Sequence, residues 1–345
     1  MPNRPVVGVP GQVPGTSATA GTFRAVPGAG AAPVCSVVNP PATGVLRRLF
    51  PVPAGRVDAA RTWLELGSVA ARRPRRASSV LLVRDAPEGV SCWLGLRGPE
   101  SPLGIISFAG GSCAEQDEEQ VPWFGPSPAK WAAQLGLSDH MVAKAHVLAA
   151  VRELFEETGV LLAGRDELSL VEDTSGEDWM RARQALAADE ITFPALLAKR
   201  GWGVRTDLLR PVSHWISPAY ELRRFDTYYF AAAAPTGQDV APLATKARWG
   251  RWVCAKEAGA HPESTAFGDE IDTGETRGRP LSDLATPATQ IMLEKLRRTR
   301  GCVAYLSSKR QIQAFQPELV EVEDRLLLDV TTVDAAEGSS VARGR

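Results

Sequence analysis

Three glutamates at helical spacing constrain this chain more than any other feature of its sequence. They stand in the run R-E-L-F-E-E-T-G-V at residues 152–160. At about 100° per residue, Glu156 lies about 60° to one side of Glu153 and Glu157 lies about 40° to the other side. Like charges at this spacing destabilise an isolated helix by about 0.2–0.5 kcal/mol per pair, so another group must compensate for them. A divalent cation is a natural candidate, because Mg²⁺ prefers oxygen ligands and often bridges carboxylates to phosphates.

The neighbouring residues favour this interpretation over a solvated acidic helix face, which is the usual meaning of an isolated E-x-x-E-E. Gly159 can end the helix in the left-handed conformation, and Arg152 is placed to orient Glu153 by an ion pair. We therefore expect Glu153, Glu156 and Glu157 to hold Mg²⁺ or Mn²⁺. Glu153 and Glu157 are the first choices, because they lie one turn apart.

The same run resembles the second half of the Nudix box, whose pattern is R-E-U-x-E-E-x-G-U with U an aliphatic residue. No position of that half departs from the pattern. The first half matches more loosely. Gly110 and Gly111 correspond to the family's Gly-Gly turn, but Asp117 stands where the family carries Glu, and Ala109 stands where it commonly has Pro.

Residues 118–151 separate the two halves, whereas most Nudix boxes have seven residues there. A split box of this kind resembles the coenzyme A diphosphatase branch of the superfamily, the nucleoside diphosphate-linked moiety X motif 19-like proteins. The resemblance covers residues 77–330. It implies metal-dependent hydrolysis of a diphosphate linkage in a small-molecule substrate, with coenzyme A or acyl-coenzyme A favoured. ADP-ribose or a dinucleotide is an alternative substrate, and a non-catalytic ligand-binding module is the alternative outside the enzymes.

Several residues are candidates for contacts with the substrate. Gly110 and Gly111 permit close approach of the backbone to a ligand, because they lack a side chain. Arg97 offers a cation near them. Arg223 and Arg224 are adjacent guanidiniums that could clamp a phosphate, although one should point away if the segment is extended. Within the acidic helix, the resemblance implies catalytic roles for four residues: Arg152, Glu153, Glu156 and Glu157.

The general base is not identified by the sequence. In the resembling proteins a later loop carries a Glu, but the matching place at residues 243–248 has no acid. This departure, together with Asp117 and Ala109, keeps the non-catalytic alternative open, although the intact R-E-x-x-E-E weighs against it. Glu221, Asp269 and Glu270 are possible replacements, each more often an ordinary surface acid. His214 is as readily a packed core histidine as a phosphate donor.

Composition limits the class of protein. The net charge of −1 gives no support for general nucleic-acid binding. The five cysteines are odd in number and show no C-x-x-C spacing, so we expect neither a disulfide framework nor a zinc site. We expect the protein to reside in the reducing cytoplasm. No apolar stretch approaches the roughly 20 residues that span a bilayer, so we expect no membrane partner. The sequence leaves open whether the chain forms a homodimer.

Four segments are expected along the chain. Residues 1–56 are rich in Gly, Pro and Ala without patterned hydrophobicity, and disorder is favoured there over a targeting peptide. Residues 57–76 read as a helix and a basic linker. Residues 77–330 form the hydrolase domain, with an insertion at about 118–137, and residues 331–345 form a flexible tail.

The patterns of the third segment predict an α/β fold, a Nudix-type α/β/α sandwich with a mixed sheet and helical insertions. Strands 78–84 and 91–97 should form a hairpin, and strand 103–108 should lead to a Gly-Gly turn. Ser127 and Ser138 should cap a short helix and the long acidic helix. Further expected elements are helices at 179–186, 193–199 and 287–297, strands at 208–216, 227–232, 248–253 and 318–330, and a mobile loop at 257–283.

Overall fold

The computed structural model describes residues 37–38, 45–67, 69–243 and 248–333. The strands are β1 (Val37–Val38), β2 (Val45–Pro51), β3 (Arg75–Ala86), β4 (Gly89–Leu96), β5 (Ile106–Ser107), β6 (Ala109–Ser112), β7 (Trp123–Phe124), β8 (Ala163–Gly164), β9 (Gly203–Arg205), β10 (Arg210–Ile216), β11 (Phe225–Ala233), β12 (Gly250–Cys254), β13 (Ala314–Phe315), β14 (Glu318–Val322) and β15 (Arg325–Val333). The helices are α1 (Val57–Leu66), α2 (Pro128–Leu135), α3 (His140–Thr158), α4 (Glu177–Ala187), α5 (Phe193–Arg200), α6 (Ala255–Ala260), α7 (Ala266–Ile271), α8 (Leu281–Leu284), α9 (Pro287–Arg297) and α10 (Cys302–Ser307).

The central sheet is mixed and runs in the order β12-β4-β3-β11-β10-β13. Its β3–β11 and β10–β13 pairs are parallel, whereas β3–β4 and β10–β11 are antiparallel. The predicted hairpin of β3 and β4 is confirmed, but its two strands pair only from Val83↔Cys92 to Ala86↔Gly89. Beyond this point β6 pairs with β3 and β5 pairs with β4. The sheet therefore opens locally, and the chain that carries Gly110 and Gly111 lies inside the opening.

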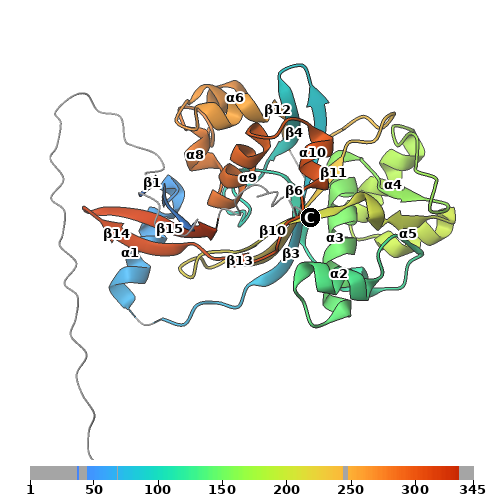
Figure 1. Cartoon of the computed structure of the whole chain (residues 1–345), viewed down its shortest axis with the longest axis horizontal. Helices are drawn as coiled ribbons and strands as arrows, with labels where there is room; N and C mark the ends of the chain where they lie inside the picture. Colours follow the sequence, from blue (N-terminus) through green and yellow to red (C-terminus); the bar gives the residue numbers. More distant parts are fainter. Residues whose placement is uncertain (1–36, 39–44, 68, 244–247, 334–345) are drawn as a thin grey trace, which may run out of the picture. The chain divides into compact units, whose positions relative to one another are not determined.

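Two hydrophobic cores lie on opposite faces of this sheet. Alternate residues of β3 enter different cores, with Leu81 and Val83 in one and Val80 and Leu82 in the other. Helix α9 packs in the first core and α3 in the second, so the sheet is covered by helices on both faces (Figure 1). The predicted α/β sandwich with a mixed sheet is confirmed.

Helix α3 is an interior helix. Asp139 caps its start, where the side-chain Oδ1 accepts from the Met141 N–H at 2.7 Å, so the predicted cap at Ser138 is wrong by one residue. Its predicted end is confirmed, since Gly159 adopts φ 81° and donates to the Phe155 carbonyl. Every residue of the helix from position 143 to 158 is buried. The acids of α3 are therefore not part of a solvated face.

The predicted insertion stays against this helix. Its α2 begins at Pro128 after the Ser127 cap, as expected, and packs on α3. Trp131 is buried and meets the ring of Phe230 edge-on at 5.8 Å. The Lys144 ammonium on α3 binds the carbonyl oxygens of residues 118 and 119 at 3.0 and 2.6 Å. These contacts hold both ends of the insertion close to the acidic helix.

The expectation of disorder over residues 1–56 is wrong for residues 45–56, while residues 1–36 and 39–44 lie outside the described chain. Strand β2 pairs with β15 from Val45↔Val333 to Pro51↔Leu327. Phe50 is buried in the first core, and the Arg48 guanidinium binds Glu294 of α9. The strand was missed because its partner lies about 280 residues away in the sequence. Strand β15 also extends three residues into the segment expected as a flexible tail.

Two local predictions also need correction. Residues 257–283 contain helix α7 and parts of α6 and α8 rather than one mobile loop, because Ala258, Ile271 and Leu281 are buried in the first core. The expected Gly-Gly turn is the middle of strand β6, where Gly110 pairs with Ser79. No helix in the described ranges is both long and apolar enough to cross a bilayer.

Strand β2 gives a direct test of this core. Replacing the buried Phe50 by Ala should lower the free energy of unfolding by about 3–5 kcal/mol, because a large side chain is removed from a packed interior. Urea denaturation of both proteins measures the change. Leu66→Ala, at a side chain that is 64% exposed, is the matched control and should change stability by less than about 0.5 kcal/mol. An equally small effect of Phe50→Ala would show that β2 does not belong to the core.

Candidate active site

The guanidinium of Arg152 organises the acidic end of α3. Its Nε and Nη2 donate to the two oxygens of Asp117, both at 2.9 Å. Its Nη1 donates to Glu153 at 2.8 Å and to Glu156 at 2.9 Å, and Nη2 also donates to the Ser112 carbonyl at 2.9 Å. All five N–H donors of the side chain are therefore used. The predicted ion pair between Arg152 and Glu153 is confirmed.

This network keeps Arg152 charged. Burial lowers the pKa of Arg152, but Glu153, Asp117 and Glu156 outweigh it and hold the pKa above its usual value. Asp117 is fully buried and also accepts from the Ala114 N–H at 2.8 Å. Asp117 is thus fully engaged, in a bidentate pair with the arginine.

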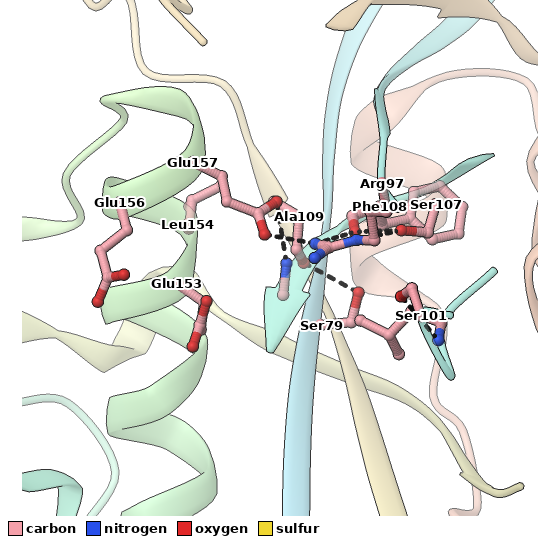
Figure 2. A network of polar contacts seen from close by, with 12 residues as sticks. Ser79, Arg97, Ser101, Ser107, Phe108, Ala109, Glu153, Leu154, Glu156 and Glu157 are labelled. Carbon is pink, nitrogen blue, oxygen red and sulfur yellow. Dashed lines mark hydrogen bonds and ion pairs between the residues drawn. The ribbon is translucent and has the colours of Figure 1, made fainter. Parts of the chain in front are cut away.

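Glu157 is held by a different cation. Its Oε1 accepts from Arg97 Nη2 at 2.5 Å, and its Oε2 accepts from the Gly110 N–H at 3.3 Å (Figure 2). Arg97 is itself fixed by Ser107 Oγ at 2.6 Å and the Phe108 carbonyl at 3.3 Å. Burial raises the pKa of Glu157 to about 7, with Arg97 opposing the rise and Glu153 adding to it.

The two glycines of β6 are required by close packing. A Cβ at Gly110 would lie 2.4 Å from the Ser78 carbonyl oxygen, and one at Gly111 would lie 2.5 Å from the carboxyl carbon of Glu153. The contact at Gly110 is with backbone and leaves no room for a side chain, whereas a Cβ at Gly111 would have to push the Glu153 carboxylate aside. The pair thus brings β6 against β3 and lets the Glu153 carboxylate rest on the backbone of Gly111.

The donor set of this site fits a hard divalent cation by its chemistry. Four buried carboxylates and the two guanidiniums bound to them meet here: Asp117, Glu153, Glu156, Glu157, Arg97 and Arg152. Arg183 lies alongside and donates to the Glu156 carbonyl at 3.0 Å, while burial lowers its pKa to about 10. The four carboxylates outnumber the three arginine side chains. Oxygen donors with excess negative charge suit Mg²⁺ or Mn²⁺.

The carboxylates are not gathered as a ready ligand set. Across residues 37–38, 45–67, 69–243 and 248–333, no three His, Cys, Asp or Glu side chains are grouped to hold a metal. In Figure 2 the three glutamates of α3 leave the helix in different directions, with Glu157 turned to Arg97 and Glu156 on the far side. Glu153 and Glu156 each give an oxygen to Arg152. A cation would therefore require these side chains to turn.

The predicted phosphate clamp of Arg223 and Arg224 is not formed. The Arg224 guanidinium is buried and donates to the Ser217 carbonyl at 3.1 and 3.0 Å and to the Arg72 carbonyl at 2.6 Å. Burial lowers its pKa. Arg223 is exposed, so one side chain of the pair does point away as expected. Arg224 is occupied by backbone carbonyls that follow β10 and precede β3.

The other candidates lie apart from the α3 carboxylates. His214 stacks on Tyr228 with ring centroids 4.0 Å apart and binds Asp226, so it is a packed histidine. Burial raises the pKa of Glu221 to about 7, but the charges that act on it are those of Arg56, Arg224 and Glu100. On α7, Asp269 accepts from the Gly278 N–H and Glu270 pairs with Arg251.

The segment expected to carry the late acid does run beside the site. Ala241 N–H donates to the Thr158 carbonyl at 2.8 Å, and Leu243 N–H donates to the Glu157 carbonyl at 3.2 Å. Residues 244–247 themselves lie outside the described chain. Sequence reasoning missed the contact of Arg183 with α3, because nothing in the polar helix around it distinguishes this arginine from a surface residue.

Comparison with solved structures identifies the fold. The crystal structure of a NUDIX hydrolase from Alicyclobacillus acidocaldarius matches with a TM-score of 0.52 at 19% sequence identity. The match covers 69% of this chain and 98% of that protein. This chain therefore has the fold of a Nudix hydrolase. No family model and no curated protein matches its sequence.

The raised pKa of Glu157 predicts how stability depends on pH. Its pKa rises from an ordinary 4.5 to about 7 on folding, so its contribution to stability is complete below about pH 4.5 and is lost as the pH rises through 7. Glu157→Gln removes this titration. Relative to wild type, the variant should gain roughly 2–3 kcal/mol of unfolding free energy between pH 4.5 and pH 8.

Urea denaturation in the presence of EDTA across this range measures the difference. Glu177→Gln, at an exposed carboxylate on α4, is the control and should give a difference that does not change with pH. A flat profile for Glu157→Gln, or one of opposite sign, would contradict the raised pKa.

Proposed function

We propose that this chain is a divalent-metal-dependent hydrolase that cleaves the diphosphate linkage of a small-molecule substrate. The observation that carries the proposal is the buried carboxylate cluster of α3, ordered by Arg152 and packed on Gly111, within a fold shared with a Nudix hydrolase. Glu153, Glu156 and Glu157 are the proposed ligands for Mg²⁺ or Mn²⁺.

Each residue of the cluster has a defined part in this proposal. When bound, the cation would neutralise the diphosphate and lower the pKa of an attacking water. Arg152 holds one oxygen of Glu153 and one of Glu156, which fixes the direction of both side chains. Asp117 keeps Arg152 in place from the other side. We assign no general base, because the candidates Glu221, Asp269 and Glu270 interact with other groups.

Coenzyme A or acyl-coenzyme A is the proposed substrate class, on the strength of the split box. The products would be a 4′-phosphopantetheine derivative and adenosine 3′,5′-bisphosphate. The expected Arg223–Arg224 pair does not support recognition of the 3′-phosphate, since Arg224 is bound to backbone carbonyls. The 3′-phosphate therefore has no assigned partner, and ADP-ribose belongs in the substrate panel.

The test is turnover of coenzyme A, ADP-ribose and a dinucleotide by the full chain with Mg²⁺ or Mn²⁺, with products identified by mass. We expect hydrolysis of at least one substrate, abolished by EDTA. Glu153→Gln should lower kcat/KM by at least about 100-fold, because loss of even an outer-sphere partner of a metal costs 10–100-fold. Glu177→Gln should leave it unchanged. Binding of these compounds without turnover would favour the ligand-binding module instead.

Gly111→Ala is a second variant for the same assay, and it keeps all the carboxylates. Its Cβ would lie 2.5 Å from the Glu153 carboxyl carbon and must displace it. Displacement of a reacting group by about 1 Å typically costs about 100-fold in rate. Gly55→Ala, where a Cβ meets nothing within 4 Å, is the matched control. Full activity of Gly111→Ala would show that this contact is not part of the site.

A further inference from the structure

Glu157 differs from the other two glutamates of α3 in its partner. Glu153 and Glu156 are bound by Arg152 of the same helix, whereas Glu157 is bound by Arg97, which follows β4 at the opening of the sheet. Figure 2 shows Arg97 reaching from the strand side to the Glu157 carboxylate. Both oxygens of Glu157 are engaged, one by this guanidinium and the other by the Gly110 N–H.

This arrangement sets two cations in competition. A divalent cation on Glu157 would have to approach a carboxylate whose Oε1 is already held by a guanidinium at 2.5 Å. In a buried site of low dielectric, two positive charges on one carboxylate repel each other strongly. A cation on Glu157 and the Arg97 guanidinium would therefore weaken each other's contact with this carboxylate.

Arg97 is less deeply buried than Arg152 and binds fewer carboxylates. The Arg152 side chain is 4% exposed and uses all five donors, whereas the Arg97 side chain is 15% exposed and its Nη1 makes no hydrogen bond within the described residues. Its remaining partners, Ser107 and Phe108, are neutral. An anionic phosphate at the cluster would offer this guanidinium a stronger partner, because charge-assisted hydrogen bonds exceed neutral ones.

We propose that Arg97 is a positioning residue that competes with the divalent cation for Glu157. Arg97 holds the Glu157 carboxylate, and a cation on Glu157 would favour its release to the substrate phosphate. The proposal rests on the metal-dependent function proposed above. Because such coupling is reciprocal, the cation and a phosphate should each bind more tightly in the presence of the other.

The test is Mn²⁺ binding to the full chain without substrate, followed by electron paramagnetic resonance of the free ion. Arg97→Met should bind Mn²⁺ at least about 10-fold tighter than wild type, within the usual range of coupling between sites. In a Glu157→Gln background the same replacement should change the affinity less than about 2-fold, because the contested carboxylate is gone.

Arg97→Gln keeps a donor for Ser107 and should shift the affinity in the same direction if Arg97→Met fails to fold. Arg181→Met, in an exposed ion pair on α4, should change nothing. Unchanged or weaker Mn²⁺ binding by the folded Arg97 variant overturns the proposal. An equal gain in the Glu157→Gln background also overturns it, since that result indicates a general charge effect. If neither wild type nor variant binds Mn²⁺, the metal-dependent function falls as well.

Discussion

The structure of the acidic site depends on one buried guanidinium. Arg152 uses every N–H donor it has, on three carboxylates and the Ser112 carbonyl. Without it, several like charges would be buried side by side with no compensation, and removing one partner of such a network typically costs 3–5 kcal/mol. The same contacts fix the direction of Glu153 and Glu156 and anchor the start of the insertion through Asp117. Arg152 therefore contributes both to the stability of the fold and to the geometry of the carboxylates.

The opening between β3 and β4 supplies the second half of the site. Because the two strands pair over only four residues on each side, β6 can enter the sheet and carry Gly110 and Gly111 to the face of α3. Where β6 approaches α3, the Glu153 carboxylate packs against the backbone of Gly111 and the Glu157 carboxylate accepts from the Gly110 N–H. From the end of β4 the same opening lets Arg97 reach Glu157. The carboxylates are thus neutralised from two directions, by Arg152 and by Arg97.

Local sequence patterns predicted the features that depend on contacts between residues close together in the chain. The end of α3 at Gly159, the cap at Ser127, the limits of α9 and the Arg152–Glu153 pair all follow from residues within one or two helical turns. Strand β2, the strand conformation of Gly110 and Gly111 and the Arg97–Glu157 pair depend on partners far away along the chain. The paired clamp at Arg223 and Arg224 failed for the same reason, since the carbonyls that occupy Arg224 could not be located from the sequence.

The central claim is that the carboxylates of α3 form a divalent-cation site. Anomalous diffraction from a crystal of the full chain soaked in Mn²⁺ tests it most directly, because the signal locates the ion independently of activity. The account predicts a manganese peak among the Glu153, Glu156 and Glu157 carboxylates, with ligand distances of about 2.0–2.3 Å. A peak elsewhere, or none at the cluster in a crystal that retains these side chains in order, would contradict it.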